Sequence, residues 1–215
     1  MEYDRYASAV RHEYASFTND VMTEYLTRSA AGVESVGAFR VYGLGKVSGL
    51  LARVLTLTND YLAPTGNGAL RDPRDNVWID TLRHIAIKNV NDLIVRLMGG
   101  AGRLADTLTR PAGAVGLLLQ RKVARPELTA TDHSGRKWQA DKLVAVMARD
   151  FAYQAYLDAT IDKLKGEGVE WVQVAHPSAY HPHHGLVMRL AEVGQLRKSI
   201  FHPNSHARLV PHVPT

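Results

Sequence analysis

Histidine is the residue type with the most capacity for chemistry in this chain, and it is concentrated late in the sequence. Seven of the ten histidines follow Ala175, in a stretch that has no cysteine and only one acidic residue, Glu192. Imidazoles at this density ligate a metal ion, form a polar network that braces a small domain, or create a pH-sensitive surface. The seven are His176, His181, His183, His184, His202, His206 and His212.

The spacing of these histidines permits a metal site in loops but disfavours one on a helix. His202 and His206 are four residues apart, a spacing that would bring both to one helix face, but Pro203 directly follows His202. Loop histidines also bind zinc, and His183, His202 and His206 are the candidate ligands for such a site. The sequence predicts no cofactor, and zinc is the metal that such a site would hold.

Catalysis at such a site needs a carboxylate as general base or as a partner that orients a ligand. Glu192 is the only local carboxylate, so the sequence assigns no catalytic residue and no cofactor-binding residue, and it favours a non-enzyme. A metal-dependent hydrolase or nuclease that uses the histidine cluster is the alternative, because His-Pro-Asn-Ser-His over 202–206 resembles a short His-Asn-His nuclease pattern.

A serine hydrolase is not supported. The chain has no Gly-x-Ser-x-Gly sequence to place a nucleophilic serine on a strained turn. Asp132, His133 and Ser134 contain the residue types of a catalytic triad, but three consecutive residues are too local to form one. This segment is therefore predicted to be a polar turn.

The composition is that of an ordinary globular protein with one large or two small domains. Of the 215 residues, 46% are hydrophobic and 22% charged, which suffices for a buried core. The absence of cysteine excludes disulfides and thiolate metal sites. A net charge of +5, scattered along the chain, allows nonspecific contact with DNA. No secretory signal and no apolar run of membrane-spanning length are visible, so no membrane partner is expected.

The positions of the apolar residues predict an α+β protein with two regions. Residues 1–123 form the first region, which is mostly helical; residues 124–215 form the second, in which a long helix leads into a small β-containing part. Steps of three and four residues predict helices over 3–26, 50–62, 72–98 and 141–165, and alternation predicts strands over 169–175 and 208–213. Residues 104–123 are also predicted to be helical, but Pro111 and Gly113 interrupt them, which predicts a kink or two short helices.

Two features of the helical region leave alternatives open. Glycines between residues 32 and 49 indicate a bend or a close helix–helix contact, and their spacing does not fit a nucleotide-binding loop. The stripe of aromatic residues from Tyr3 to Tyr25 fits packing against the next helix better than a partner-binding face.

Three motifs in the second region occur together and in a fixed order. The first is D-x-x-G-R-x-W, formed by Asp132, Gly135, Arg136 and Trp138. The second is the strand sequence Glu-Trp-Val-Gln-Val, residues 170–174, after the long helix. The third is the closing segment F-H-P-N-S-H-A-R-L-V-P, residues 201–211, whose motif positions are Phe201, His202, Pro203, Asn204, Ser205, His206 and Pro211.

This combination resembles the minor capsid (minor head, Mu F-like morphogenesis) proteins of tailed bacteriophages, over about residues 115–213. The resemblance implies that Gly135, Arg136, Trp138, His202, Pro203, Asn204 and His206 form a structural motif. The family often carries cysteines in the first loop and at the position of Ser205, where this chain has none. Any cysteine-containing metal site of the relatives is thus lost here or rebuilt from imidazoles.

The resemblance also implies a role and a location. Such a protein is a structural component of the virion that associates with the portal, the major capsid protein or both during head assembly. It would be present in several copies in the particle, and in the host cytoplasm while heads assemble.

Overall fold

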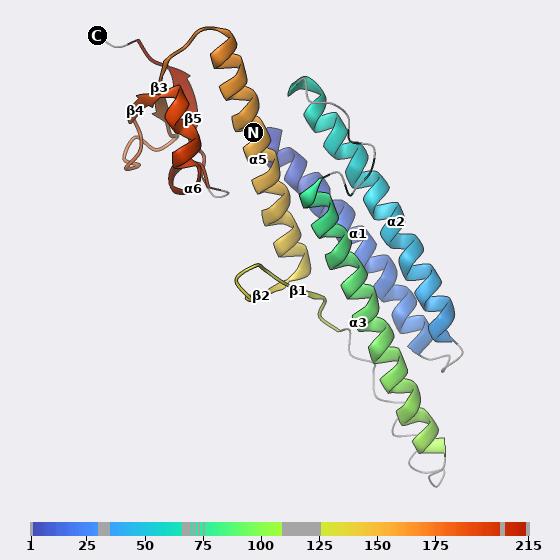
Figure 1. The fold of residues 1–215 in the computed structure, drawn as a ribbon. Helices are drawn as coiled ribbons and strands as arrows, with labels where there is room; N and C mark the ends of the chain where they lie inside the picture. Colours follow the sequence, from blue (N-terminus) through green and yellow to red (C-terminus); the bar gives the residue numbers. More distant parts are fainter. Residues whose placement is uncertain are drawn as a thin grey trace. The chain divides into compact units, whose positions relative to one another are not determined.

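The computed structural model describes residues 2–29, 35–65, 70, 72, 74, 76–108, 126–202 and 205–213. The fold is α+β, as predicted: helices dominate, and two small antiparallel sheets follow the helical N-terminal region (Figure 1). In chain order the elements are α1 (Glu2–Ser29), α2 (Ser35–Leu62), η1 (Ala63–Thr65), α3 (Val77–Leu108), β1 (Thr129–Thr131), β2 (Lys137–Gln139), α5 (Ala140–Gly166), β3 (Trp171–Ala175), β4 (Val187–Arg189), η3 (Leu190–Leu196), α6 (Arg197–Ile200) and β5 (Arg208–Pro211).

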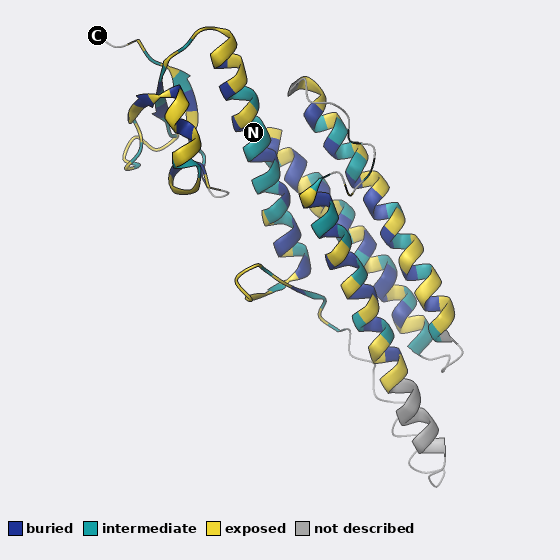
Figure 2. Cartoon of the chain, viewed as in Figure 1, coloured by how far each residue is buried: buried dark blue, intermediate teal, exposed yellow. Residues whose placement is uncertain are grey.

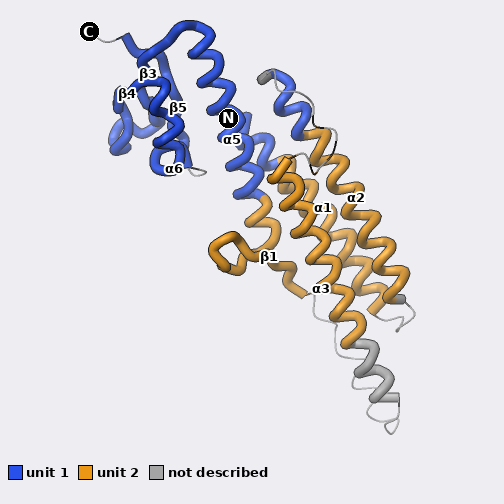
Figure 3. Tube along the Cα trace, in the orientation of Figure 1, with its two compact units in different colours: residues 1–8, 58–69, 145–215 blue, residues 9–57, 70–144 orange. Residues whose placement is uncertain are grey.

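The chain divides into two compact units that are discontinuous in sequence (Figure 3). Unit 1 consists of residues 1–8, 58–69 and 145–215, and unit 2 consists of residues 9–57 and 70–144. Helices α1, α2 and α5 each contribute to both units. The expected division into residues 1–123 and 124–215 stays a prediction.

Unit 2 is built around a bundle in which α1 and α2 run antiparallel. Contacts between them pair residues in opposite order along the chain: the rings of Tyr25 and Phe39 lie 6.3 Å apart, and the Lys46 ammonium lies 2.8 Å from the Asp20 carboxylate. Helix α3 joins the bundle through a buried hydrogen bond of 2.5 Å between the Asn89 amide and the Tyr14 hydroxyl. The buried faces of these helices form the core of the unit (Figure 2).

The described part of the glycine-rich segment, from Ser35 on, is helical and contains the close contact that was one of its two predicted roles. It belongs to α2, which begins at Ser35 rather than at residue 50 as the sequence suggested. At Gly43 a Cβ atom would lie 2.7 Å from a Val90 methyl of α3, so only glycine lets the two helices approach this closely. At Gly45 a Cβ atom would meet nothing within 4 Å.

Helix α3 begins later and ends later than predicted. Asp72 precedes the helix, whose first turn is capped by the Asn76 side chain, which accepts the Trp78 amide at 3.0 Å. The glycines near residue 100 do not end it, because a terminating glycine adopts positive φ. Among the described residues, only Gly135, Gly168 and Gly185 do so. Residues 109–123 of the last predicted helix lie outside the described residues.

The aromatic stripe of α1 is core, as predicted. In unit 2, Tyr14 and Phe17 are buried. In unit 1, Tyr3 lies against Tyr153 at 5.3 Å between ring centroids, and Tyr6 lies against Tyr61 at 4.9 Å. Ring pairs at these distances stabilise a core beyond the area that they bury.

The small β part of unit 1 is a three-stranded antiparallel sheet with the order β4-β3-β5. Two of its strands, β3 and β5, were predicted, while β4 and the short helices η3 and α6 were not, since three to seven residues give no clear periodicity. Helix α5 leads into the sheet and ends at Gly166, close to the predicted end. Gly168, with φ 72°, turns the chain toward β3.

None of the helices in the described part of the chain combines the length and the apolar character needed to cross a membrane.

The contact at Gly43 makes opposite predictions for two neighbouring glycines of α2. Gly45→Ala should raise the free energy of unfolding by about 0.5–1 kcal/mol, because alanine restricts the unfolded chain and favours the helix. Gly43→Ala should lower it by about 1–3 kcal/mol, because the new methyl overlaps the stiff Val90 side chain. Chemical denaturation followed by circular dichroism measures both. Equal effects at the two positions would contradict the close contact.

Candidate functional site

The first motif forms a β-hairpin whose tip is organised by one carboxylate. Asp132, on the turn between β1 and β2, accepts five hydrogen bonds from its own hairpin. Its Oδ1 accepts from the amide and the hydroxyl of Ser134 and from the Arg136 amide, at 2.9, 2.7 and 2.9 Å. Its Oδ2 accepts from Arg136 Nε at 3.0 Å and from the Trp138 indole N–H at 2.9 Å.

The other residues of the motif complete this turn. Gly135 has φ 81°, a conformation that favours glycine, and its amide donates to the Asp132 carbonyl at 3.0 Å. The Arg136 guanidinium lies 5.7 Å from the centre of the Trp138 ring. The donors from Ser134, Trp138 and Arg136 hold the pKa of the Asp132 carboxyl well below its usual range. A carboxylate held in this way shapes the hairpin and is a poor general base.

Two hydrogen bonds from side chains of helix α5 hold the closing segment. The Tyr153 hydroxyl donates to the Ala207 carbonyl at 2.9 Å, and the Gln154 amide donates to the Phe201 carbonyl at 2.9 Å. The Phe201 side chain is fully buried. Ser205, at the position where the related family often has cysteine, is buried too, and its hydroxyl accepts the Ala207 amide at 3.1 Å.

His206 of this segment faces a cation. Both of its ring nitrogens lie 3.4 Å from Nη2 of Arg149, a residue of α5. The same guanidinium donates through Nε to the Asp4 carboxylate of α1 at 2.8 Å. Sequence analysis did not find this cluster, because Asp4 and Arg149 are 145 residues apart and only the folded unit brings them together.

Four other histidines lie on the loop between β3 and β4, residues 176–186. The rings of His176 and His181 stack, with centroids 3.9 Å apart and an interplanar angle of 21°, and His183 follows at 5.4 Å from His181. Burial lowers the pKa of His181, and the neighbouring imidazoles of His176, His183, His202 and His184 lower it further.

The three candidate zinc ligands come from this loop and from the closing segment. His183 lies in the loop, His202 is exposed, and His206 lies beside Arg149. Within the described part of the chain, no three histidine or acidic side chains come close enough together to hold a metal ion. The zinc site stays a prediction. Pro203 and Asn204 of the structural motif lie outside the described residues.

Glu192, the carboxylate that a catalytic metal site would use, has a structural contact. Its side chain accepts the backbone amide of Arg189 at 3.3 Å, at the start of η3. This contact caps the short helix.

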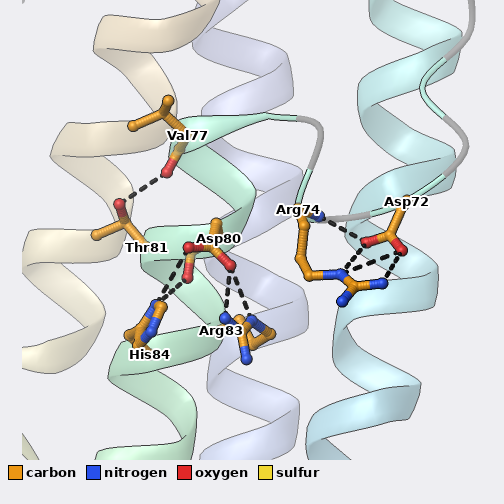
Figure 4. Close-up of polar contacts among 7 residues, drawn as sticks. All are labelled: Asp72, Arg74, Val77, Asp80, Thr81, Arg83 and His84. Atoms are coloured by element: carbon orange, nitrogen blue, oxygen red, sulfur yellow. Dashed lines mark hydrogen bonds and ion pairs between the residues drawn. The ribbon is translucent and has the colours of Figure 1, made fainter.

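A further polar cluster, which the sequence did not single out, lies around the start of α3 (Figure 4). Arg74 donates to Asp72 through its backbone and its guanidinium, which holds the pKa of Asp72 at about 2. Arg83 Nε donates to Asp80 at 2.9 Å, and His84 Nδ1 lies 2.8 Å from the Asp80 carbonyl oxygen. These contacts are exposed or partly buried, and they join residues three or four apart on one helix or within one turn. They therefore stabilise local structure by small amounts.

Comparison of the chain with known protein families, with curated proteins and with solved structures found no match in any of the three.

The hairpin geometry predicts that Asp132→Asn loosens the turn whereas His133→Asn does not. Asparagine keeps one acceptor but turns an amide donor toward the donors of Arg136 and Trp138. The Trp138 indole N–H resonance should therefore shift in Asp132→Asn and stay at the wild-type position in His133→Asn, which changes an exposed neighbour. An unchanged resonance in Asp132→Asn would contradict the assigned role.

The same resonance has a predicted pH dependence. Because the pKa of Asp132 is lowered on folding, the stability that its carboxylate contributes is present above the unfolded-state pKa of about 4. That stability should be lost progressively as the pH falls below this value. An NMR titration of the wild-type protein should show the indole resonance constant down to about pH 4.

The Tyr153 contact predicts that Tyr153→Phe destabilises the protein at neutral pH and has a smaller effect on stability at high pH. Tyr153→Phe should lower the free energy of unfolding by about 1 kcal/mol at pH 7, since one buried hydrogen bond is lost. Burial raises the pKa of Tyr153 to about 12, so its contribution is complete below pH 10 and lost as the pH rises toward that value. Denaturation at pH 7 and at pH 11 tests both expectations. A difference that grows with pH would contradict them.

Proposed function

We propose that this chain is a minor capsid protein of a tailed bacteriophage that acts in head morphogenesis. Its partners are the portal protein, the major capsid protein or both, and it acts in several copies in the assembling head. Its places of action are the virion and, during assembly, the host cytoplasm. The proposal starts from the three motifs that occur in order between residues 132 and 211.

The observation that carries the proposal is the use of the first motif's polar groups. The Asp132 carboxylate accepts five hydrogen bonds, all from residues of its own hairpin. Gly135, Arg136 and Trp138 each contribute to the same turn. When the polar groups of a motif bind one another, they fix the conformation of the turn and are not free to act on a substrate. This supports a structural role in assembly rather than a catalytic one.

The closing motif supports the same conclusion. Phe201 is buried, and the chain around Ser205 and Ala207 is bound to α5 through Tyr153. These contacts hold the end of the motif as part of a folded unit. A net charge of +5 is compatible with nonspecific contact with packaged DNA, whose phosphates attract basic proteins.

The test is incorporation into heads. The chain is co-expressed with the portal, scaffold and major capsid proteins of the same virion, and assembled heads are purified and analysed by quantitative mass spectrometry. Wild-type chain should be recovered with the heads in several copies per particle. A chain absent from both procapsids and mature heads would overturn the proposal.

Two variants make the test specific. His133→Asn removes an exposed imidazole and should be incorporated as efficiently as the wild type. Asp132→Asn changes the adjacent residue to the same amide and should be incorporated several-fold less, because it loosens the hairpin of the first motif. Equal incorporation of both variants would show that incorporation into heads does not depend on the hairpin.

The alternative function, a metal-dependent hydrolase or nuclease, makes a different prediction for the same purified protein. It requires stoichiometric zinc or manganese and cleavage of a substrate such as DNA, both lost when His183, His202 and His206 are replaced together by alanine. Metal analysis by mass spectrometry and a DNA cleavage assay measure the two properties. Cleavage that depends on these histidines would replace the assembly proposal.

A further inference from the structure

The loop between β3 and β4 consists of short turns held by backbone hydrogen bonds between its own residues. The His181 amide donates to the Ser178 carbonyl at 3.1 Å, and the His184 amide donates to the His181 carbonyl at 2.9 Å. The two ends of the loop are joined where the Gly185 amide donates to the Val174 carbonyl at 2.8 Å. The shape of the loop therefore depends on a few local hydrogen bonds. The loop also carries Tyr180, which is 98% exposed.

A further hydrogen bond of the loop fixes the protonation state of His176. Its Nδ1 lies 3.1 Å from the Ser178 amide nitrogen, which donates to it. A ring nitrogen can accept a hydrogen bond only when it carries no proton, so His176 is neutral in this arrangement, with its proton on Nε2. Protonation of Nδ1 would set two donors against each other and leave the Ser178 amide without this acceptor.

Ring stacking also favours the neutral form of His176. The His176 ring lies on the His181 ring at a centroid distance of 3.9 Å. Protonating one of two imidazoles this close becomes harder when the other is charged. Burial lowers the pKa of His181, and the imidazoles of His176, His183, His202 and His184 lower it further. The loop thus brings together side chains that repel one another when they are charged.

His184 behaves differently, although it lies in the same loop. Its Nδ1 lies 3.1 Å from the His176 amide nitrogen and 3.0 Å from the His176 carbonyl oxygen. The unprotonated nitrogen can accept from the amide, and the protonated nitrogen can donate to the carbonyl. This contact therefore survives a change of charge, whereas the contact between His176 and Ser178 does not.

We propose that the β3–β4 loop is a pH-sensitive switch whose closed form requires neutral His176 and opens when that imidazole is protonated. Histidine side chains change charge between about pH 5 and 8, so the switch operates within the range that cells and their compartments span. Opening releases the turn at Ser178 and moves the exposed Tyr180. The proposal does not depend on the proposed role in head assembly.

The first experiment reads the charge state directly in the full-length wild-type protein. Long-range proton–nitrogen NMR spectra identify which ring nitrogen of each histidine is protonated. At pH 8, His176 should be neutral with the proton on Nε2. A neutral His176 with its proton on Nδ1 would overturn the proposal without any variant.

The second experiment measures the loop itself. Hydrogen exchange of the Ser178 amide, corrected for its intrinsic pH dependence, is measured between pH 8 and pH 5. The protection factor should fall by about fivefold, which corresponds to ~1 kcal/mol, the net value of a typical hydrogen bond. Protection that does not change with pH in the wild-type protein would contradict the switch.

His176→Asn is the matched variant, because the asparagine side-chain oxygen accepts the amide two residues on and does not titrate. Its Ser178 amide should show no pH-dependent loss of protection. His133→Asn, which removes an imidazole from the exposed hairpin tip, should behave as the wild type. The same fall in His176→Asn as in the wild type would assign the pH dependence to another group and overturn the proposal.

Discussion

The burial of the aromatic face of helix α1 is the interaction on which both compact units depend. In unit 2, Tyr14 and Phe17 are buried within the helical bundle, and in unit 1, Tyr3 and Tyr6 pack against rings from α2 and α5. Each fully buried ring contributes about 1.5–3 kcal/mol through removal of apolar surface from water. No other helix supplies large aromatic side chains to the cores of both units on this scale within the described residues.

Tyrosine brings a polar atom into the core with each ring, and the structure satisfies these atoms individually. Tyr14 bonds to Asn89, Tyr6 to Thr58, and Tyr61 to the Ala152 carbonyl. An unpaired hydroxyl in these positions would destabilise the fold by about 1–3 kcal/mol. Because sliding one helix along another would break these bonds, each bond also restricts that movement. The polar contacts therefore define the register that apolar packing alone would leave loose.

In two polar segments of the chain, the side chains form hydrogen bonds within their own turns. In the hairpin, Asp132 collects the donors of its neighbours. In the β3–β4 loop, His176 and His181 each accept a backbone amide from the residue two positions on. A histidine that accepts a hydrogen bond through Nδ1 carries its proton on Nε2, so this pattern assigns a tautomer to each of the two rings.

The sequence by itself determined the α+β class, helix α5, strands β3 and β5, and the polar turn at Asp132. Each rests on local periodicity or local turn chemistry, which residues near one another in the chain define. The starts of α2 and α3 were predicted wrongly. Glycine and proline lower the local helix propensity, but tertiary packing decides whether the helix forms despite them.

Only the tertiary structure decided which distant residues meet. Gly43 faces Val90, Asp4 faces Arg149, and Tyr153 faces Ala207. It also turned a list of closely spaced histidines into a stacked pair with defined hydrogen-bond roles. The physical reason is that a hydrogen bond or a ring contact depends on distances of a few ångströms between side chains, and the order of residues fixes those distances only within a turn or two.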